Sequence, residues 1–424
     1  MVLTDQVLVD GRARTRAAGH ERPPPVVEET STLDGMFSRA ALRKPAAIAL
    51  QEGPHLLTYG KAEARAVQLA TALVRGGVQL GDPVIVHCES HAQALLAQLA
   101  VLKAGGVCVP VAPGTDAALV ERVARISGAR TALCSRSTQP VWAGRAACLV
   151  LDAEEAWSKI GALRVDRALP RSEPTGAAYL LVDHGDGPVG GGQLVDHRAW
   201  GLALAARVHH VGRVTSTVRT SQLPLGAPSL SAMWWAFRCG GAVRVPPAGG
   251  GADTAGAFGS AVAVFGPREY RLVLEAARQA PRPARPRVVV LLGGPCPDDL
   301  ADLHFEVLPT TRLWAEFAPA GGAVPWATRE LPPGHRTGGT GIAVGRPVPR
   351  AHVRILGPDG RLVPTGLAGE VCATGPALPF DSIPAPRWGS PVHGGGAPLR
   401  SGRLGRWRPD GVLEITGTVG VRGE

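Results

Sequence analysis

At 424 residues, with 45% hydrophobic and 19% charged side chains, the chain is long enough for two or three packed subdomains and lacks the composition of a disordered protein. Its formal charge of +10 suggests a nucleic-acid partner, but the arginines are dispersed and only 4% of the residues are aromatic, so we expect none. No apolar run approaches the roughly 18 residues of a membrane-spanning helix, and the N-terminus lacks a signal-peptide core. We therefore expect no membrane partner and a cytoplasmic location.

The first 150 or so residues predict an extension followed by alternating strands and helices. Residues 1–32 are polar, end in a proline-rich stretch and are typical of a linker. A helix is expected to begin near Ser31–Thr32. Beyond it, the pattern predicts helices over 61–77 and 92–106, and strands over 56–60, 82–88, 107–113, 129–135 and 147–153. This alternation predicts a mostly parallel sheet covered by helices.

The same alternation repeats after a glycine-rich break. It predicts strands over 177–182, 241–247, 260–266 and 287–294, and helices over 197–211 and 268–279. From about Thr337 the pattern changes to short β-type pieces separated by GPDG and RPDG turns. A smaller β-rich unit is therefore expected at the C-terminal end.

Motifs for a metal site, a disulfide framework or a nucleophile are weak. The seven cysteines are scattered, none forms a CxxC pair, and buried free thiols are expected. The pairs His209–His210 and Asp196–His197 have no further ligand at a suitable spacing, so structural roles are expected. Ser229 and Ser231 lie in no GxSxG context. We expect no catalytic residue and no metal ligand.

Four longer segments carry a family resemblance: LTYG (57–60), VLKAGGVCVPVAP (101–113), VGRPVPRAHVRILGPDGRLVPTGLAGEV (344–371) and RWRPDGVLEITG (406–417). In this order they resemble the large subdomain of a nonribosomal peptide synthetase adenylation domain, within the adenylate-forming superfamily. The resemblance implies an α/β fold of two αβαβα layered subdomains plus a distorted β-barrel, with the mobile C-terminal lid of complete members absent. These motifs set turns and cores, so they specify a fold and not a reaction.

The implied domain organisation follows from this resemblance. Residues 1–32 form an N-terminal extension, and 33–334 form the two αβαβα subdomains of an adenylation-like domain. Residues 335–416 form the β-barrel-like subdomain, and 417–424 form a truncated hinge in which Thr418 replaces the family's arginine.

The family's phosphate loop, roughly YTSGSTGxPKG, is replaced here by DHGDGPVGG (183–191). The lysine position is Gly191, and the hydroxyl and glycine positions become Asp183, His184, Gly185, Asp186 and Gly187. Two carboxylates in this loop would repel a triphosphate, at about 4 kcal/mol for each contact at about 4 Å. The alternative is a flexible turn without ligand, since a glycine-rich loop alone is a weak signal.

The family's other site positions are also substituted. Its aspartate for the substrate amine is Ala227, a change that an acid without an amino group would tolerate. The aromatic residue against adenine is Phe317, which retains a ring, whereas the acid for magnesium is Gly321. The aspartate for the ribose hydroxyls is Arg403, which can only donate hydrogen bonds. The only lysines are Lys44, Lys61, Lys103 and Lys159, so none lies in the later parts where the family uses them.

Three hypotheses follow. The leading one is a degenerate, non-catalytic adenylation domain of a nonribosomal peptide synthetase or hybrid assembly line, a scaffold for carrier-protein or neighbouring synthetase and tailoring domains, with amino-acid activation supplied in trans and no cofactor. The alternative is an active, divergent enzyme that uses ATP and Mg²⁺ to activate an amino or carboxylic acid for transfer to a carrier-protein thiol. The third is a module that uses the cleft to bind another ligand or partner.

Overall fold

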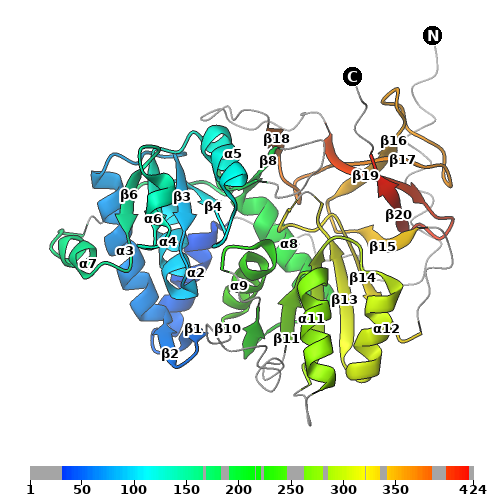
Figure 1. Ribbon diagram of the computed structural model, residues 1–424, viewed down its shortest axis with the longest axis horizontal. Coiled ribbons are helices and arrows are strands. Elements are labelled where there is room, and N and C mark those ends of the chain that lie inside the picture. Colours follow the sequence, from blue (N-terminus) through cyan, green and yellow to red (C-terminus); the bar gives the residue numbers. More distant parts are fainter. Residues whose placement is uncertain are drawn as a thin grey trace.

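The computed structural model describes residues 31–165, 169–182, 191–214, 216–220, 224–245, 262–279, 285–319, 321–334, 341–383 and 398–419. The extension predicted at 1–32 lies almost entirely outside these residues, as does most of the hinge predicted at 417–424. Two sheets organise the described part, one in each lobe of Figure 1.

The N-terminal lobe is built on a seven-stranded sheet with the order β18-β8-β7-β4-β3-β5-β6. Neighbouring strands are parallel from β7 through β4, β3 and β5 to β6, as the alternation of elements predicts. The strands are β3 (Pro83–His87), β4 (Val107–Pro110), β5 (Thr131–Cys134), β6 (Ala147–Val150), β7 (Ala177–Val182), β8 (Gly192–Asp196) and β18 (Asp381–Ile383).

The second sheet has thirteen strands in the order β16-β17-β19-β20-β15-β14-β13-β12-β11-β9-β10-β1-β2. Its central part is parallel, from β1 through β10, β9 and β11 to β13. These strands are β1 (Ile48–Glu52), β2 (His55–Thr58), β9 (Thr217–Arg219), β10 (Ala242–Val245), β11 (Val262–Phe265), β12 (Val288–Gly293), β13 (Arg312–Phe317) and β14 (Ala327–Leu331).

The short β-type pieces expected from about Thr337 are, within residues 342–418, antiparallel strands that continue this sheet. These strands are β15 (Ile342–Pro347), β16 (His352–Leu356), β17 (Gly369–Thr374), β19 (Leu399–Trp407) and β20 (Leu413–Thr418). Among the described residues β16 is an open edge, so these strands do not form a closed barrel. Gly345, with φ +103°, lets β15 approach β14, since a Cβ there would lie 2.1 Å from the Thr328 carbonyl oxygen.

The helices begin where the sequence supplies a cap. Thr32, Thr58 and Ser90 accept hydrogen bonds at the N-termini of α2, α3 and α4, which explains why these helices begin at those positions. The described helices are α2 (Leu33–Arg43), α3 (Tyr59–Arg75), α4 (His91–Lys103), α5 (Ala117–Ser127), α6 (Gln139–Trp142), α7 (Glu154–Gly161), α8 (His197–His210), α9 (Ala227–Cys239), α11 (Pro267–Arg278) and α12 (Asp298–Val307).

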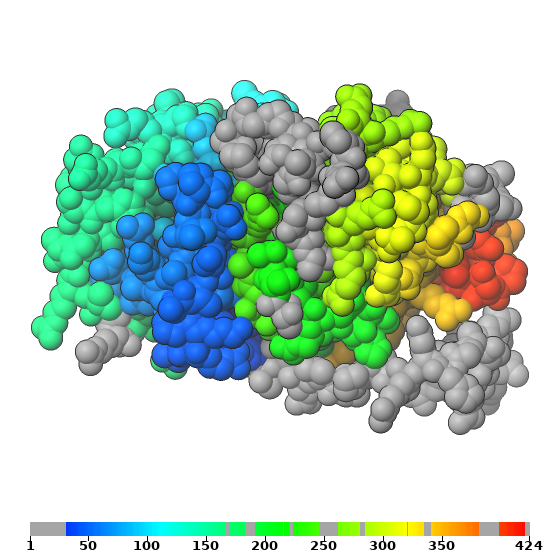
Figure 2. Space-filling model, turned by 90° about the horizontal axis from the view of Figure 1, so that it is seen from below, coloured from blue at the N-terminus to red at the C-terminus, as the bar shows by residue number. Residues whose placement is uncertain are grey.

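Helix and sheet layers alternate because the buried strands are apolar on both faces. Val84 and Val86 of β3 pack into the central core, whereas Ile85 packs against α5 residues on the outer face. The second sheet repeats this arrangement, with Val290 of β12 in the central core and Val289 in the outer core with α11 and α12. Helices α2, α4, α8 and α9 lie between the sheets, and Figure 2 shows green residues from this region between the blue and yellow lobes. The expected α/β layered fold is confirmed.

Candidate functional site

Three of the predicted site positions, Phe317, Gly321 and Ala227, lie at or shortly after the carboxyl ends of strands. Strand β7 ends at Val182, directly before the predicted phosphate loop, and β13 ends at Phe317. Helix α9 begins at Ala227, shortly after the end of β9. Ligands of open α/β sheets bind outside the carboxyl ends of the strands, so this is the candidate site.

The predicted phosphate loop connects β7 and β8, which pair as an antiparallel hairpin with Val182 opposite Gly192. Gly191 is the described member of the predicted set and directly precedes β8. The base of the hairpin is tight, because a Cβ on Gly192 would lie 2.7 Å from Leu180 Cδ1. The other predicted positions lie outside the described residues: Asp183, His184, Gly185, Asp186 and Gly187.

The hairpin lies beside the turn that follows β13. Gln193 Nε2 on β8 donates a hydrogen bond of 3.3 Å to the Pro319 carbonyl. A Cβ on Gly322 would lie 2.9 Å from Gln193 Oε1 and 3.0 Å from the Pro319 carbonyl oxygen, so a larger residue there would push the Gln193 side chain away. The structure thus brings the strand after the predicted phosphate loop together with the turn that carries the predicted adenine and magnesium positions.

Phe317 offers little surface to a ligand. Its residue is 2% exposed and belongs to a core with Leu202, Trp326 and Val348. Its carbonyl also accepts a hydrogen bond of 2.7 Å from the Trp326 amide. Stacking of adenine on this ring stays a prediction.

The turn at Gly321 does not fit a magnesium ion. Gly321 has φ +67°, a conformation that favours glycine, and it brings no side chain to the turn. Magnesium prefers carboxylate oxygens. The acid next to Phe317 in the chain is Glu316, and its carboxylate is already hydrogen-bonded to Arg207. In the described part of the chain, no group of three or more His, Cys, Asp and Glu residues is placed to hold a metal ion.

Arg403 lies on β19 opposite Thr418 of β20. Its backbone amide donates a hydrogen bond of 3.1 Å to Ser401 Oγ, and Gly402 between them has φ +65°. The strand and its bend are therefore formed, with a guanidinium at the position that the resemblance assigns to an acid. A guanidinium has no lone pair for a ribose hydroxyl to donate to.

Ala227 is the first residue of α9. Gly226 occupies the cap position, Pro228 follows, and no side chain from the described residues caps this end. The first turn also contains no acidic residue. The N-terminus of a helix carries a partial positive charge of about half an elementary charge, which disfavours an ammonium group.

A buried ion pair next to these positions was not predicted from the sequence. Arg207 of α8 and Glu316 of β13 are 2% and 3% exposed and form two hydrogen bonds, of which Nε to Oε1 is 2.8 Å. The guanidinium also donates to Ser231 Oγ at 2.6 Å and lies 5.2 Å from the centre of the Trp235 ring. The space between α9 and β13 is therefore filled by a paired guanidinium.

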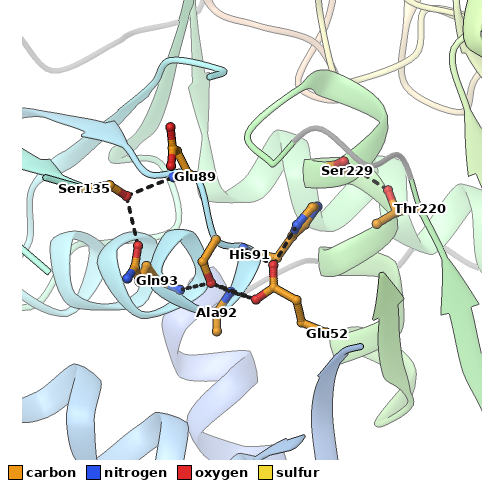
Figure 3. A network of polar contacts seen from close by, with 9 residues as sticks. Glu52, Glu89, His91, Ala92, Gln93, Ser135, Thr220 and Ser229 are labelled. Carbon is orange, nitrogen blue, oxygen red and sulfur yellow. Dashed lines mark hydrogen bonds and ion pairs between the residues drawn. The ribbon is translucent and has the colours of Figure 1, made fainter. Parts of the chain in front are cut away.

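A second polar network, also not predicted, joins β1 to α4 (Figure 3). The Glu52 carboxylate accepts hydrogen bonds from Ser90 Oγ at 2.7 Å and from the His91 and Ala92 amides at 2.9 and 3.2 Å. Nδ1 of His91 lies 3.4 Å from the same carboxylate. Burial alone would raise the pKa of Glu52, but the hydrogen bonds from His91 and Ser90 outweigh burial and lower the pKa to about 2.

Glu52→Gln is expected to lower the free energy of unfolding by about 2–3 kcal/mol at pH 7. Because the folded-state pKa of Glu52 is below its ordinary value of 4.5, the stabilisation is complete above about pH 5 and is lost as the pH falls from 4.5 towards 2. Urea unfolding of the unmodified protein and of Glu52→Gln measures the difference between their free energies of unfolding. This difference should be smaller at about pH 3.5 than at pH 7 by about 1 kcal/mol or more. Glu121→Gln, which breaks an exposed ion pair with Arg145, should cost less than about 1 kcal/mol at either pH. An unchanged gap at the lower pH would contradict the capping role of Glu52.

The remaining candidate pairs have structural roles. Asp196 caps α8. Burial raises the pKa of Asp196 to about 6, although the hydrogen bond from the Ala199 amide and the charge of Arg198 act to lower it. Burial lowers the pKa of His197 to about 4, and its Nδ1 accepts a hydrogen bond of 3.0 Å from the Leu33 amide. His210 lies against the Trp314 ring. The seven cysteines are free thiols, as expected.

Comparison with known proteins shows which family the chain belongs to. A family model described as AMP-binding enzyme matches residues 37–182 and 194–379. Phosphinothricin tripeptide synthetase PhsB of Streptomyces viridochromogenes is 27% identical over 92% of this chain, which spans 34% of that protein. Tyrocidine synthase 2 of Brevibacillus parabrevis is 26% identical over 92% of this chain, which spans 11% of that protein.

Solved structures show the same fold. The crystal structure of the nonribosomal peptide synthetase FmoA3 matches 94% of this chain and 43% of its own, with a TM-score of 0.76 and 22% identity. VinN matches 92% of this chain and 99% of its own, with a TM-score of 0.77 and 18% identity. No helix within the described ranges is long and apolar enough to span a membrane.

Proposed function

Because the chain belongs to the AMP-binding enzyme family, we propose that it is an adenylation domain that retains the fold of that family and has lost its chemistry. It serves a nonribosomal peptide synthetase or hybrid assembly line as a scaffold. Its partners are a carrier protein or neighbouring synthetase and tailoring domains, and amino-acid activation is supplied in trans.

One observation carries this proposal: the backbone elements of the site are formed, while the side chains that would act there are replaced. Helix α9 begins at Ala227, the turn after β13 forms around Gly321, and Arg403 lies on β19 next to its bend at Gly402. The backbone therefore keeps regular structure at the positions where catalysis would need two carboxylates and an amine-binding acid. Such a combination is expected when selection preserves the fold and not the reaction.

The buried pair Arg207–Glu316 supports the same proposal. Glu316 is adjacent to Phe317 in the chain, but both of its oxygens are bonded to the guanidinium. It cannot substitute for the missing magnesium acid without leaving Arg207 as an unpaired buried charge, which costs several kcal/mol.

The proposed scaffold role is supported by the length of the synthetases that this chain resembles. The tripeptide synthetase PhsB and tyrocidine synthase 2 are much longer than this chain. A domain that has lost its reaction and remains within such an assembly still holds its neighbours at fixed separations. A purified carrier protein should therefore raise the melting temperature of this chain if it binds the folded state.

The decisive experiment is ATP–pyrophosphate exchange with the full-length chain, using a panel of amino acids and of aryl and acyl acids. We expect exchange at the level of the enzyme-free blank, since each lost electrostatic contact of this kind costs on the order of 10²–10³ in rate. An active adenylation domain purified in parallel is the positive control. Acid-dependent exchange above the blank would overturn the proposal and establish the alternative, an active and divergent adenylate-forming enzyme.

A further inference from the structure

The first turn of α2 is held by a side chain from a distant part of the sequence. The Leu33 amide donates a hydrogen bond of 3.0 Å to Nδ1 of His197, the first residue of α8, which lies 164 positions away in the chain. Thr32 caps the same turn by accepting a hydrogen bond from the Gly35 amide. The first amides of a helix have no partner within the helix, so His197 supplies the acceptor that Leu33 lacks.

The direction of this bond fixes the protonation state of His197. A backbone amide can only donate, so Nδ1 is the nitrogen without a hydrogen and Nε2 carries it. His197 is 0% exposed, and its Nε2 has no hydrogen-bond partner within the described parts of the chain. A proton on Nδ1 would place two N–H groups against each other in a buried space. The bond therefore exists only while the imidazole is neutral.

Two helices begin at this point, and two acids lie beside their first turns. Leu33 opens α2 and His197 opens α8, and each helix carries about half a positive charge at its N-terminus. Asp34 lies in the first turn of α2, and Asp196 caps α8. Burial outweighs the attraction of Asp34 and lowers the pKa of His197 from an ordinary value of 6.5 to about 4. Burial therefore decides the state of the imidazole.

The elements packed against α2 present an ion pair and a neutral thiol. Glu63 of α3 and Lys103 of α4 lie 2.7 Å apart and neutralise each other. Burial raises the pKa of the Cys108 thiol on β4 well above its ordinary value, so this thiol carries no charge. Glu173, in the loop before β7, is exposed to solvent. These groups keep their state between pH 5 and pH 7, whereas His197 does not once it reaches water.

Asp196 titrates in the same range with the opposite effect. Burial raises the pKa of Asp196 to about 6, so its protonation relieves a buried charge and favours the folded state as the pH falls. Its hydrogen-bond partners, the Ala199 amide and Arg198, belong to α8 and not to α2. A comparison that is restricted to α2 and retains Asp196 in every protein therefore isolates the contribution of His197.

We propose that His197 is a proton-sensitive latch for the first turn of α2. The turn is held while the imidazole is neutral, and it is released when Nδ1 takes up a proton from water and loses the lone pair that accepts the Leu33 amide. Opening exposes the imidazole to solvent, where protonation is favourable, so the two steps support each other. Because α8 directly follows β8, the latch joins the first described helix to the strand after the predicted phosphate loop. It needs no ATP and does not depend on the proposed function.

Hydrogen exchange of the full-length chain at pH 7 and pH 5, followed by mass spectrometry, tests the latch. The pKa of His197 is about 4 in the closed state, whereas a histidine in solvent has a pKa of 6.5, so opening gains as the pH falls below 6.5. We expect residues 33–37 to open about twentyfold more often at pH 5 than at pH 7, after correction for the slower intrinsic exchange at pH 5. Helix α5, which contains no histidine, is the internal reference. Equal protection of residues 33–37 at both pH values, or an equal loss in α5, would overturn the proposal.

His197→Asn separates the latch from other effects of acid. The asparagine Oδ1 takes the place of Nδ1 as an acceptor and does not titrate between pH 5 and pH 7. The ratio of opening at the two pH values should therefore fall from about twentyfold to within about threefold. This ratio is compared, and not the absolute protection, because asparagine is smaller than histidine. His55→Asn changes an exposed histidine and should keep the ratio of the unmodified protein. Equal ratios in the two variants would remove His197 from the latch.

Direct titration of His197 in the unmodified protein covers the case in which the asparagine variant does not fold. Exchange of the C2 hydrogen of a histidine ring depends on its protonation, and mass spectrometry of the peptide that contains His197 follows this exchange against pH. We expect a pKa of His197 well below the ordinary value of 6.5, because the buried Nδ1 is occupied by the Leu33 amide. A pKa at or above 6.5 would show that the imidazole is not held neutral, and would overturn the proposal without any variant.

Discussion

Arg207→Met is expected to lower the free energy of unfolding by about 3–5 kcal/mol, the cost of leaving one member of a buried ion pair without its partner. Arg207 and Glu316 are 2% and 3% exposed, so water cannot replace the lost guanidinium. The substitution also removes the hydrogen bond to Ser231 Oγ and the contact with the Trp235 ring. Methionine retains much of the side-chain volume, so loss of the charge dominates over a cavity.

A double variant separates the charge from the packing. Arg207→Met combined with Glu316→Leu replaces the pair by apolar side chains of similar volume, and such replacements in proteins are often neutral or stabilising. We expect the double variant to recover most of the stability lost in Arg207→Met. Urea unfolding of the two single variants and the double variant gives the coupling energy directly.

The exposed ion pair between Arg271 and Asp299 is the matched control. Its members are 37% and 67% exposed, and Asp299→Asn should change stability by less than about 1 kcal/mol. A loss of unfolding free energy in Arg207→Met no larger than that in Asp299→Asn would contradict this account of the buried pair. So would a double variant that is several kcal/mol less stable than Arg207→Met alone.

The layered fold could be predicted because its signals are local. The predicted strands 82–88 and 107–113 appear as β3 and β4, and the predicted helices 61–77 and 268–279 appear as α3 and α11, within a few residues of the observed ends. Strands of a buried parallel sheet are short apolar runs, and helices covering them are amphipathic, so length and period suffice.

Helix α9 carries no such signal. Its segment APSLSAMWWAFRC is buried on nearly every side, because it lies between the two sheets. A helix without a polar face has no amphipathic period and resembles any other buried apolar run. The central helix of the candidate site therefore could not be located from the sequence pattern alone.

The site itself was predictable only where the resemblance assigned positions. It identified what is missing at Ala227, Gly321 and Arg403, but not the polar groups that occupy the region. Arg207 and Glu316 are 109 residues apart, and Glu52 and His91 are 39 apart, so neither pair forms a motif. The one usable signal is a lone glutamate within the otherwise apolar strand LWAEF, where an acid needs a buried partner.

Tyr179→Phe is expected to cost about 2–5 kcal/mol, although it removes a single oxygen atom. Tyr179 Oη accepts a hydrogen bond of 2.9 Å from Trp234 Nε1 on α9 and donates one of 2.8 Å to Gln98 Oε1 on α4. All three side chains are buried, and burial raises the pKa of Tyr179, which keeps its hydroxyl protonated. The substitution leaves one donor and one acceptor unpaired, each at about 1–3 kcal/mol.

Tyr59→Phe supplies the comparison for this network. Tyr59 is equally buried, and its hydroxyl donates a hydrogen bond of 2.6 Å to the Gly241 carbonyl. Loss of that bond leaves one unpaired group, so we expect about half the cost of Tyr179→Phe. Adding Trp234→Phe to Tyr179→Phe removes the unpaired donor, and the further cost should be smaller than that of Trp234→Phe alone.

Because Tyr179 lies on β7 of one sheet and Trp234 on the helix that covers the other, the hydroxyl joins the two lobes at the candidate site. Hydrogen exchange of the Trp234 indole N–H, followed by NMR, should therefore accelerate in Tyr179→Phe far more than in Tyr59→Phe. Equal exchange rates in the two variants would mean that packing alone holds the lobes together, and that the network contributes to stability without fixing their arrangement.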